Sequence, residues 1–389
     1  MDFFTEPAFF VLLLPIVLVA AALGMTERPL GHYGCAVSLF MLFLLFFRSV
    51  PALLYAGCYL ASSILLYRWV RGLFADGENE RALRGYYVAL VLQIAPLVLY
   101  KVGVLFKPDF PGFLGISYIT FKAVQALIET RDGLIKDMSC GEYLYFLSFF
   151  PTFTSGPILR SRPFVDDLRA RLTRMDYLDR LYRGIGWFVL GAAYKFVGSA
   201  LAQWGMWFVP SVVGVPALSW LATVLFYGLD LFFDFAGYSD MAMGLGLALG
   251  IEVPRNFNLP FVATDIKEFW DRWHMSLSTW LRDFVFMRFS RFALGRKLFP
   301  SRHITACVGF VINMTLMGLW HGITPDYFVY GLYHGALLAG YHYYQQTSKF
   351  YKKHRRDRWY RLTSWAITMV AVFFGFALFG GYVVTPLLG

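Results

Sequence analysis

Apolar residues along this chain form long runs that are separated by short polar stretches. Nine runs suit helices that span a membrane, whose hydrocarbon core takes about 20 residues to cross. These runs cover residues 8–24, 33–47, 50–67, 86–106, 184–208, 216–236, 303–320, 326–346 and 363–386. Three shorter apolar segments contain Gly, Pro or Ser, which predicts broken or re-entrant helices that line a tunnel. They cover residues 112–128, 143–158 and 238–251. The pattern predicts an all-α polytopic membrane protein with about ten or more spanning helices.

Composition supports the same class. The chain is 58% hydrophobic and 15% charged, whereas roughly a quarter of residues are charged in soluble proteins. Its 11 Trp and 24 Tyr suit the two membrane interfaces, where these side chains concentrate. No basic segment precedes the first apolar run, so we expect a retained span rather than a cleaved signal peptide. Without an internal repeat or a separate soluble segment, residues 1–389 are predicted to form one membrane-embedded domain.

Basic residues gather between the apolar runs, which accounts for the net charge of +10 without a nucleic-acid partner. The basic stretches cover residues 68–84, 160–183, 282–302 and 349–361. Positively charged loops favour the cytoplasmic side, so we expect all of these stretches there. The runs 303–320 and 326–346 then form a hairpin whose apex, 320–326, points to the outer face.

The candidate chemistry begins with His321, which follows Trp320 at the end of an apolar run in which Asn313 and Thr315 are the strongly polar residues. Imidazole titrates near neutrality, so a histidine at membrane depth is a candidate acid or base. Burial favours the neutral form, which acts as a general base. Gly318 and Gly322 allow another chain or a ligand to approach closely. The alternative is a structural histidine bonded to a nearby carbonyl.

A second candidate, His274, lies in a stretch that we predict as one helix over residues 264–286. One face of this helix is apolar and mostly aromatic: Phe269, Trp270, Trp273, Leu277, Trp280, Leu281 and Phe284. Its other face carries charges: Asp271, Arg272, Arg282 and Asp283. His274 falls at the border of the aromatic face, as in an interfacial helix with one polar group turned inward. A surface helix without chemistry fits the pattern equally well.

Further polar candidates lie in apolar surroundings. Asp230, Asp234 and Tyr238 follow one another at i+4 steps, so they share one stripe of a helix. The two carboxylates are expected to pair with Lys195 or Arg255, or to line a polar cavity. The broken segment 149–160, which includes Ser155, suits the wall of a substrate path or a surface for an acidic partner. The four cysteines are far apart and no histidine lies at ligand spacing, so no metal site is predicted.

Three motifs together give a resemblance to a known family. They are Asn256-Phe-Asn-Leu-Pro-Phe261, Phe269-Trp-Asp-Arg-Trp-His-Met-Ser-Leu-Ser-Thr-Trp-Leu-Arg-Asp283 and Met317-Gly-Leu-Trp-His-Gly322. They make the chain similar to the membrane-bound O-acyltransferases. Segments 150–158, 282–289 and 327–335 resemble the members that transfer D-alanyl groups in teichoic acid modification. The resemblance covers most of the chain.

The resemblance implies a multi-pass enzyme of the cell membrane with a helical bundle around a central tunnel. His321 would be its catalytic general base, and His274 would position a substrate or stabilise an oxyanion. Positioning roles along the tunnel would fall to Trp320, Asn313, Trp273, Ser276, Asp230, Asp234, Tyr238 and Ser155. The chain itself would bind no cofactor, because the phosphopantetheine arm comes with an acidic D-alanyl carrier protein from the cytoplasm. Other expected partners are membrane-anchored proteins of the pathway and an outer-face teichoic acid or other envelope polymer.

Two alternatives remain open at this stage. The alginate O-acetylation proteins share the histidine motifs, and Gly237-Tyr-Ser-Asp-Met-Ala242 leans toward them, so acetyl transfer to an exopolysaccharide is the first. The second belongs to other classes of protein: a proton-coupled transporter or flippase, or a structural subunit of an envelope complex. A transporter would favour internal repeats, which the sequence does not show.

Overall fold

The computed structural model of the protein describes residues 3–388 except residues 76, 78, 108, 109, 111 and 136. Over this part of the chain the regular structure consists of helices, which confirms the predicted all-α class. The chain divides into two compact units. Unit 1 comprises residues 1–192 and 237–254, and unit 2 comprises residues 193–236 and 255–389. The expectation of one folding domain stays a prediction.

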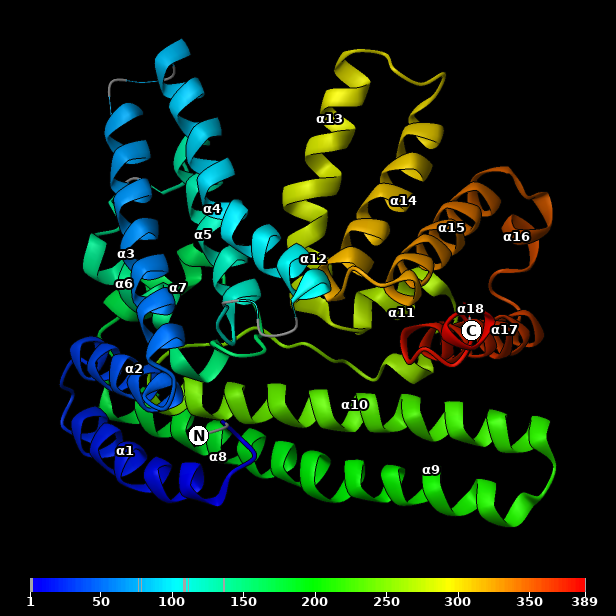
Figure 1. The fold of residues 1–389 in the computed structure, drawn as a ribbon, viewed down its shortest axis with the longest axis horizontal. Coiled ribbons are helices and arrows are strands. Elements are labelled where there is room, and N and C mark those ends of the chain that lie inside the picture. Colours follow the sequence, from blue (N-terminus) through cyan, green and yellow to red (C-terminus); the bar gives the residue numbers. More distant parts are fainter. Residues whose placement is uncertain are drawn as a thin grey trace. The chain divides into compact units, whose positions relative to one another are not determined.

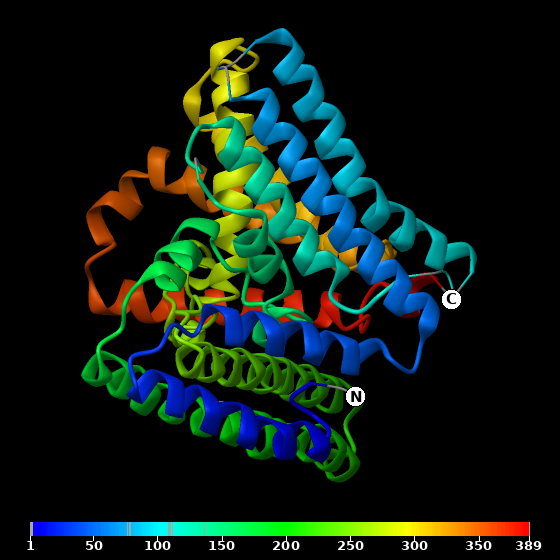
Figure 2. The same cartoon turned by 90° about the vertical axis from the view of Figure 1, so that its left-hand side faces the viewer.

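Unit 1 contains the first helices of the chain. They are α1 (Pro7–Met25), α2 (Gly31–Phe46), α3 (Val50–Leu73), α4 (Glu80–Phe106), α5 (Ile116–Arg131), α6 (Cys140–Ser148), the 3₁₀ turn η1 (Phe150–Thr152), α7 (Ser161–Arg169), α8 (Arg174–Ala193) and the end of α10 (Pro216–Ala248). Helices α3, α4 and α5 lie along one another (Figure 2). The Tyr59 hydroxyl joins all three, because it donates to the Gln93 carbonyl at 3.2 Å and lies 2.7 Å from the Thr120 hydroxyl. Such hydrogen bonds help helices associate in a membrane, where the hydrophobic effect does not drive one helix against another.

Glycines set the contact between α8 and the end of α10. A Cβ at Gly191 would lie 2.6 Å from the Gly237 carbonyl oxygen, and one at Gly184 would lie 2.8 Å from that of Gly244. These distances leave no room for a side chain, so the two backbones touch. The prediction of a separate broken segment at 238–251 is wrong, because its glycines serve this close packing and α10 continues without a break to Ala248.

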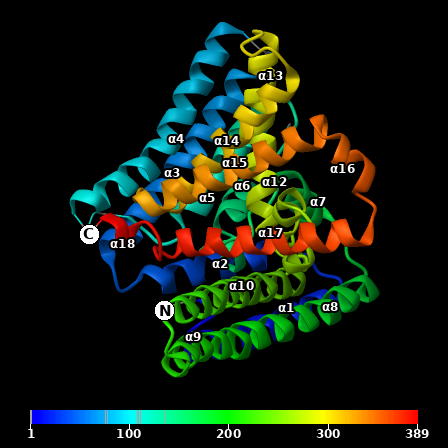
Figure 3. The same ribbon diagram turned by 90° about the vertical axis from the view of Figure 1, so that its right-hand side faces the viewer.

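Unit 2 contains the remaining elements. They are the π-helical turn η2 (Tyr194–Gly198), α9 (Ser199–Val213), the first part of α10, the 3₁₀ turn η3 (Pro260–Val262), α11 (Ile266–Arg272), α12 (Met275–Leu281), the π-helical turn η4 (Arg282–Phe286), α13 (Met287–Gly295), α14 (Arg302–His321), α15 (Pro325–Thr347), α16 (Lys349–His354), α17 (Arg358–Phe379) and α18 (Thr385–Leu388). Helices α14 and α15 form an antiparallel hairpin, which confirms that prediction (Figure 1). Figure 3 shows α16 turning the chain from α15 into α17.

Seven helices among the described residues are long and apolar enough to cross a bilayer. They are α1, α3, α4, the continuous helix Arg174–Val213, α10, α14 and α17. Two predicted spans fall outside this group. Run 33–47 forms α2, which has 16 residues, and run 326–346 forms α15, in which tyrosines, histidines and glutamines reduce the hydropathy. The multi-pass membrane class is confirmed, and the expected number of about ten spans is not reached by these criteria.

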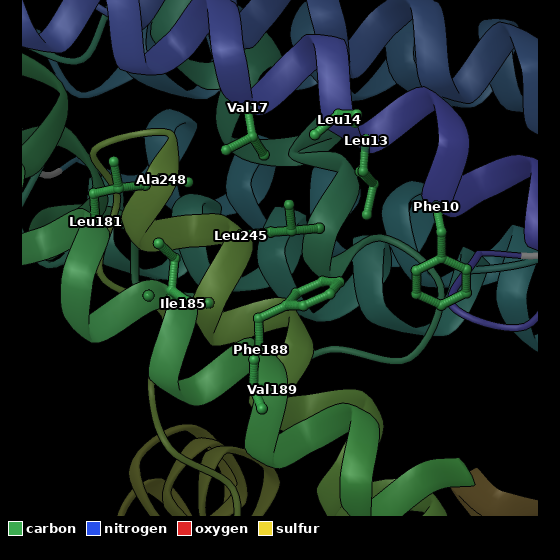
Figure 4. A pocket seen from close by; sticks show the side chains of 12 residues that line it. Phe10, Leu13, Leu14, Val17, Leu181, Ile185, Phe188, Val189, Leu245 and Ala248 are labelled. Atoms are coloured by element: carbon green, nitrogen blue, oxygen red, sulfur yellow. The ribbon is translucent and has the colours of Figure 1, made fainter.

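Unit 1 also has an open pocket of about 280 Å³ between α1, α8 and α10 (Figure 4). Its walls are apolar, and side chains such as Leu13, Ile185, Phe188 and Leu245 point into it. None of the side chains that line it carries an ionisable group. The cavity therefore offers no acid or base, and the chemistry of this protein has to be sought elsewhere.

The close contact of α8 and α10 predicts a strong effect of a side chain at Gly191. In Gly191→Leu the new side chain has to push the two backbones apart, which we expect to cost about 1–3 kcal/mol of folding free energy. Gly186→Leu is the matched control on the same helix, because a Cβ at Gly186 meets nothing within 4 Å. Thermal melting of both detergent-purified variants checks the prediction. Equal melting temperatures for the two variants would contradict the packing described above.

Candidate active site

His321 is the last residue of α14 and stands at the end of the α14–α15 hairpin. Close packing fixes it there: a Cβ at Gly318 would lie 2.2 Å from the Tyr327 carbonyl oxygen and 3.0 Å from the Gly331 backbone. The close approach predicted at Gly318 is thus made by α15 of the same chain. The imidazole of His321 is half-buried, and its ring neighbours are Tyr327 of α15, with centroids 6.1 Å apart, and Phe379 of α17, with centroids 5.0 Å apart.

His274 lies between α11 and α12, so the prediction of one continuous helix over 264–286 is wrong. Its backbone is left-handed, with φ 45°, and it caps the start of α12. This conformation costs about 1–2 kcal/mol. Asn256 stabilises the break, because its carbonyl accepts from Met275 N at 2.9 Å and its side chain accepts from Ser276 N at 3.2 Å. The break turns His274 into the protein, where 3% of its surface is exposed.

The two histidines meet within unit 2 although 47 residues separate them in the sequence. Their ring centroids are 6.4 Å apart. Aromatic rings enclose both: Phe235 is 4.7 Å from the His274 ring, and Phe379 is 5.0 Å from the His321 ring. The centroid of the Trp320 ring lies 6.3 Å from that of His274 and 4.6 Å from that of His321. This cluster is a low-dielectric site that holds two imidazoles within reach of one small substrate group.

The Nε2 atom of His274 is buried and has no hydrogen-bond partner among the described residues. A buried polar atom of this kind is unusual and calls for a function. Burial, together with the nearby His321, holds the pKa of His274 well below its usual value. The imidazole is therefore neutral at physiological pH, and one of its nitrogens is available for a ligand.

The remaining predicted site residues of unit 2 have different surroundings. Trp273 is buried, with Phe257 and Phe376 both 5.0 Å from its ring, and it supports the wall behind His274. Asn313 is buried on the stripe of α14 that leads to His321, and its Oδ1 has no hydrogen-bond partner among the described residues. Ser276 is buried at the start of α12. Of these three, Asn313 is the one that presents a polar atom for a ligand.

The stripe Asp230–Asp234–Tyr238 divides between the two units. Asp234 forms an ion pair with Lys195, which confirms the predicted pairing, and Asp230 accepts from the Ser199 hydroxyl at 2.5 Å. In unit 1, the Tyr238 hydroxyl lies 2.9 Å from that of Thr154 and accepts from Ser155 N at 3.2 Å. The carboxylates are thus engaged with side chains of η2 and α9, and Tyr238 binds the segment around Ser155.

Sequence reasoning missed His334, which is 1% exposed and is, with His274, one of two buried histidines among the described residues of unit 2. Its Nδ1 accepts a hydrogen bond from the Trp270 indole at 3.3 Å, which links α11 to α15. This bond joins the two elements that adjoin His274 and His321. Its position in an apolar helix, next to Gly335, could have marked His334 as a candidate. The sequence does not tell that Trp270 is the residue that faces it. No group of residues suited to a metal ion occurs in the part of the chain described above.

Comparison with known proteins identifies the family. Residues 37–385 match the model of MBOAT, the membrane-bound O-acyltransferase family. The chain belongs to this family. It is therefore a membrane-bound acyltransferase. This assignment favours an enzyme over the transporter and the structural subunit that the sequence left open.

Relatives of this O-acyltransferase fall into two groups. It is 37% identical to the teichoic acid D-alanyltransferase of Bacillus subtilis, over 96% of both chains. It is 36% identical to that of Streptococcus thermophilus, over 96% of this chain and 94% of the relative. A probable alginate O-acetylase, AlgI, from Pseudomonas aeruginosa is 33% identical, over 68% of this chain and 48% of the relative.

The lowered pKa of His274 predicts how the stability of this acyltransferase depends on pH. In the unfolded chain the pKa returns to about 6.5, so as the pH falls through this value the unfolded state takes up a proton that the folded state does not. The stability of the wild type should therefore decrease between pH 7.5 and pH 5.5 relative to His274→Asn. Asn is chosen because it tolerates the left-handed backbone and does not titrate. Melting curves at the two pH values check this, and a constant difference between the proteins would contradict a neutral buried His274.

Proposed function

We propose that this enzyme transfers a D-alanyl group from a thioester to a hydroxyl of teichoic acid, with His321 as the general base. The observation that carries the proposal is the end-to-end match to relatives named teichoic acid D-alanyltransferase. The alginate O-acetylase relative leaves about a third of this chain, and about half of its own length, outside the match. Acetyl transfer to an exopolysaccharide is therefore the less favoured candidate.

The proposed reaction needs a base that can take a proton and return it. His321 removes the proton from the acceptor hydroxyl while its oxygen attacks the thioester carbonyl carbon. The carbon–sulfur bond then breaks, and the imidazolium of His321 returns the proton to the departing thiolate. The products are an ester on the acceptor and a free thiol on the donor. His321 is the last residue of α14 and is only half-buried, which leaves part of its surface open to the acceptor.

His274 suits the second role, that of holding the reacting carbonyl. Its buried Nε2 is without a partner among the described residues, and as an N–H it would donate to the oxygen on which negative charge develops. A donor fixed in a buried site stabilises an oxyanion strongly because it does not have to reorganise.

The donor thioester is proposed to arrive on the phosphopantetheine arm of an acidic carrier protein in the cytoplasm, and the acceptor from the outer face. Residues 288–302 suit the carrier, because Arg291, Lys297 and Arg302 have no acidic partner among the described residues. In 160–183, Arg169 and Arg180 are held in ion pairs within unit 1, and the exposed Arg171 is the candidate there. Unpaired basic groups attract an acidic partner and speed its docking. Membrane-anchored proteins of the same pathway are further expected partners.

Transfer of labelled D-alanine from the loaded carrier protein to envelope material tests the proposal. His321→Ala should lower the rate about 10²- to 10⁴-fold, because it removes the general base. His303→Ala is the matched control, since this exposed histidine lies at the opposite end of the same helix, about 27 Å from position 321. The folding of each variant is confirmed by melting. We expect His274→Ala to lower the rate as well.

Three results decide the assignment. Loss of transfer by folded His321→Ala, with His303→Ala unchanged, supports the general base. Retained transfer by His321→Ala rejects it. If the wild type transfers labelled acetyl groups and not D-alanine, the enzyme acts in polysaccharide acetylation instead.

A further inference from the structure

A cavity of about 570 Å³ lies in unit 2 where α17 begins, and neither His274 nor His321 lines it. It is bounded by the segment around η3 and by one face of α17, and its lining residues are Phe261, Val262, Thr264, Arg358, Arg361, Leu362 and Trp365. The α17 residues are spaced i, i+3, i+4 and i+7, so they form one stripe of the helix. This stripe changes from basic to apolar along the helix.

The basic end of the stripe is not neutralised by any acidic side chain that the structure describes. Arg358 and Arg361 are exposed, and neither forms an ion pair among the described residues. The nearest carboxylate in the sequence, Asp357, is engaged by His354, whose Nδ1 lies 2.7 Å from it. Two guanidinium groups one turn apart thus face the cavity without an acidic partner. Guanidinium forks of this kind bind phosphate with paired hydrogen bonds.

The apolar end of the stripe is exposed although its residues are large and hydrophobic. Leu362 is 67% exposed, Val262 is 53% exposed and Trp365 is 43% exposed. The Trp365 indole donates to the Phe261 carbonyl at 2.9 Å, and the Ser364 hydroxyl donates to the Thr264 carbonyl at 2.6 Å. These two hydrogen bonds hold the η3 segment against α17, so the two walls of the cavity are joined to each other.

The position of the stripe tells which ligand fits. Helix α17 is one of the seven spanning helices, and it begins at Arg358. The two arginines therefore lie at the membrane surface, and Trp365, about 10 Å further along the helix, lies toward the acyl chains. The stretch 349–361, which includes both arginines, is strongly basic and suits the leaflet that carries anionic lipids.

We propose that this cavity binds an anionic phospholipid, with Arg358 and Arg361 on its phosphate and with Leu362, Trp365 and Val262 along its acyl chain. The site is independent of the proposed D-alanyl transfer, because none of its residues belongs to the histidine cluster. Bound lipid would brace α17 against the η3 segment, which precedes α11 and His274.

Native mass spectrometry of the purified full-length protein tests the proposal. Delipidated protein is titrated with phosphatidylglycerol, with phosphatidylcholine of the same chains and, in a third arm, with inorganic phosphate. We expect phosphatidylglycerol to be retained most strongly, and Arg358→Gln/Arg361→Gln to weaken its binding at least about tenfold through the loss of charge-assisted contacts. Arg355→Gln/Arg356→Gln is the matched control, because it removes the same charge from exposed residues that do not line the cavity.

Each outcome decides the proposal. Weak binding by the Arg358/Arg361 variant with near wild-type binding by the control supports a built lipid site. Equal weakening in both variants rejects it in favour of general attraction to basic residues. Equal binding of inorganic phosphate and phosphatidylglycerol rejects the lipid as the ligand. If the Arg358/Arg361 variant retains phosphatidylglycerol as well as the wild type does, the two arginines do not hold its phosphate and the proposal is rejected.

Discussion

Close contact between helix backbones is the constraint on which both units depend. Lipid is as apolar as leucine, so helices in a membrane associate through tight packing and polar links rather than through the hydrophobic effect. In unit 1, Gly184 and Gly191 of α8 meet glycine backbone of α10. In unit 2, Gly318 of α14 meets the α15 backbone. The second contact determines where α14 ends beside its partner and hence where His321 stands.

The second histidine depends on a different device, a break in the chain at a residue that tolerates a left-handed backbone. A continuous helix through His274 would distribute the side chains of residues 264–286 around one axis. The break instead directs the imidazole inward, and Asn256 satisfies the donors that the break exposes. Strain held in place by surrounding hydrogen bonds is characteristic of functional sites. Here it places an imidazole among aromatic rings, where it stays neutral.

Ionisable groups in this protein are divided between structure and chemistry by whether they find partners. Asp234 and Lys195 neutralise each other, and Arg180 is held by Asp167, so these charges stabilise packing. Within the described part of the chain, the Nε2 atom of His274 has no hydrogen-bond partner, and Arg358 and Arg361 line a cavity without an ion-pair partner. Groups left without internal partners are those that can bind something else. This division underlies both proposals, the acyl-transfer role of the histidine cluster and the lipid site at the start of α17.

The sequence by itself determined the all-α membrane class, most of the spanning helices, the α14–α15 hairpin and His321 at its apex. These features follow from local hydrophobicity, which depends on neighbouring residues alone. Tertiary structure alone decided the break at His274, the approach of its ring to His321, the link between Trp270 and His334, and the division of Asp234 and Tyr238 between two units. Each of these depends on residues far apart in the chain, and periodicity carries no information about which distant residue faces a given side chain.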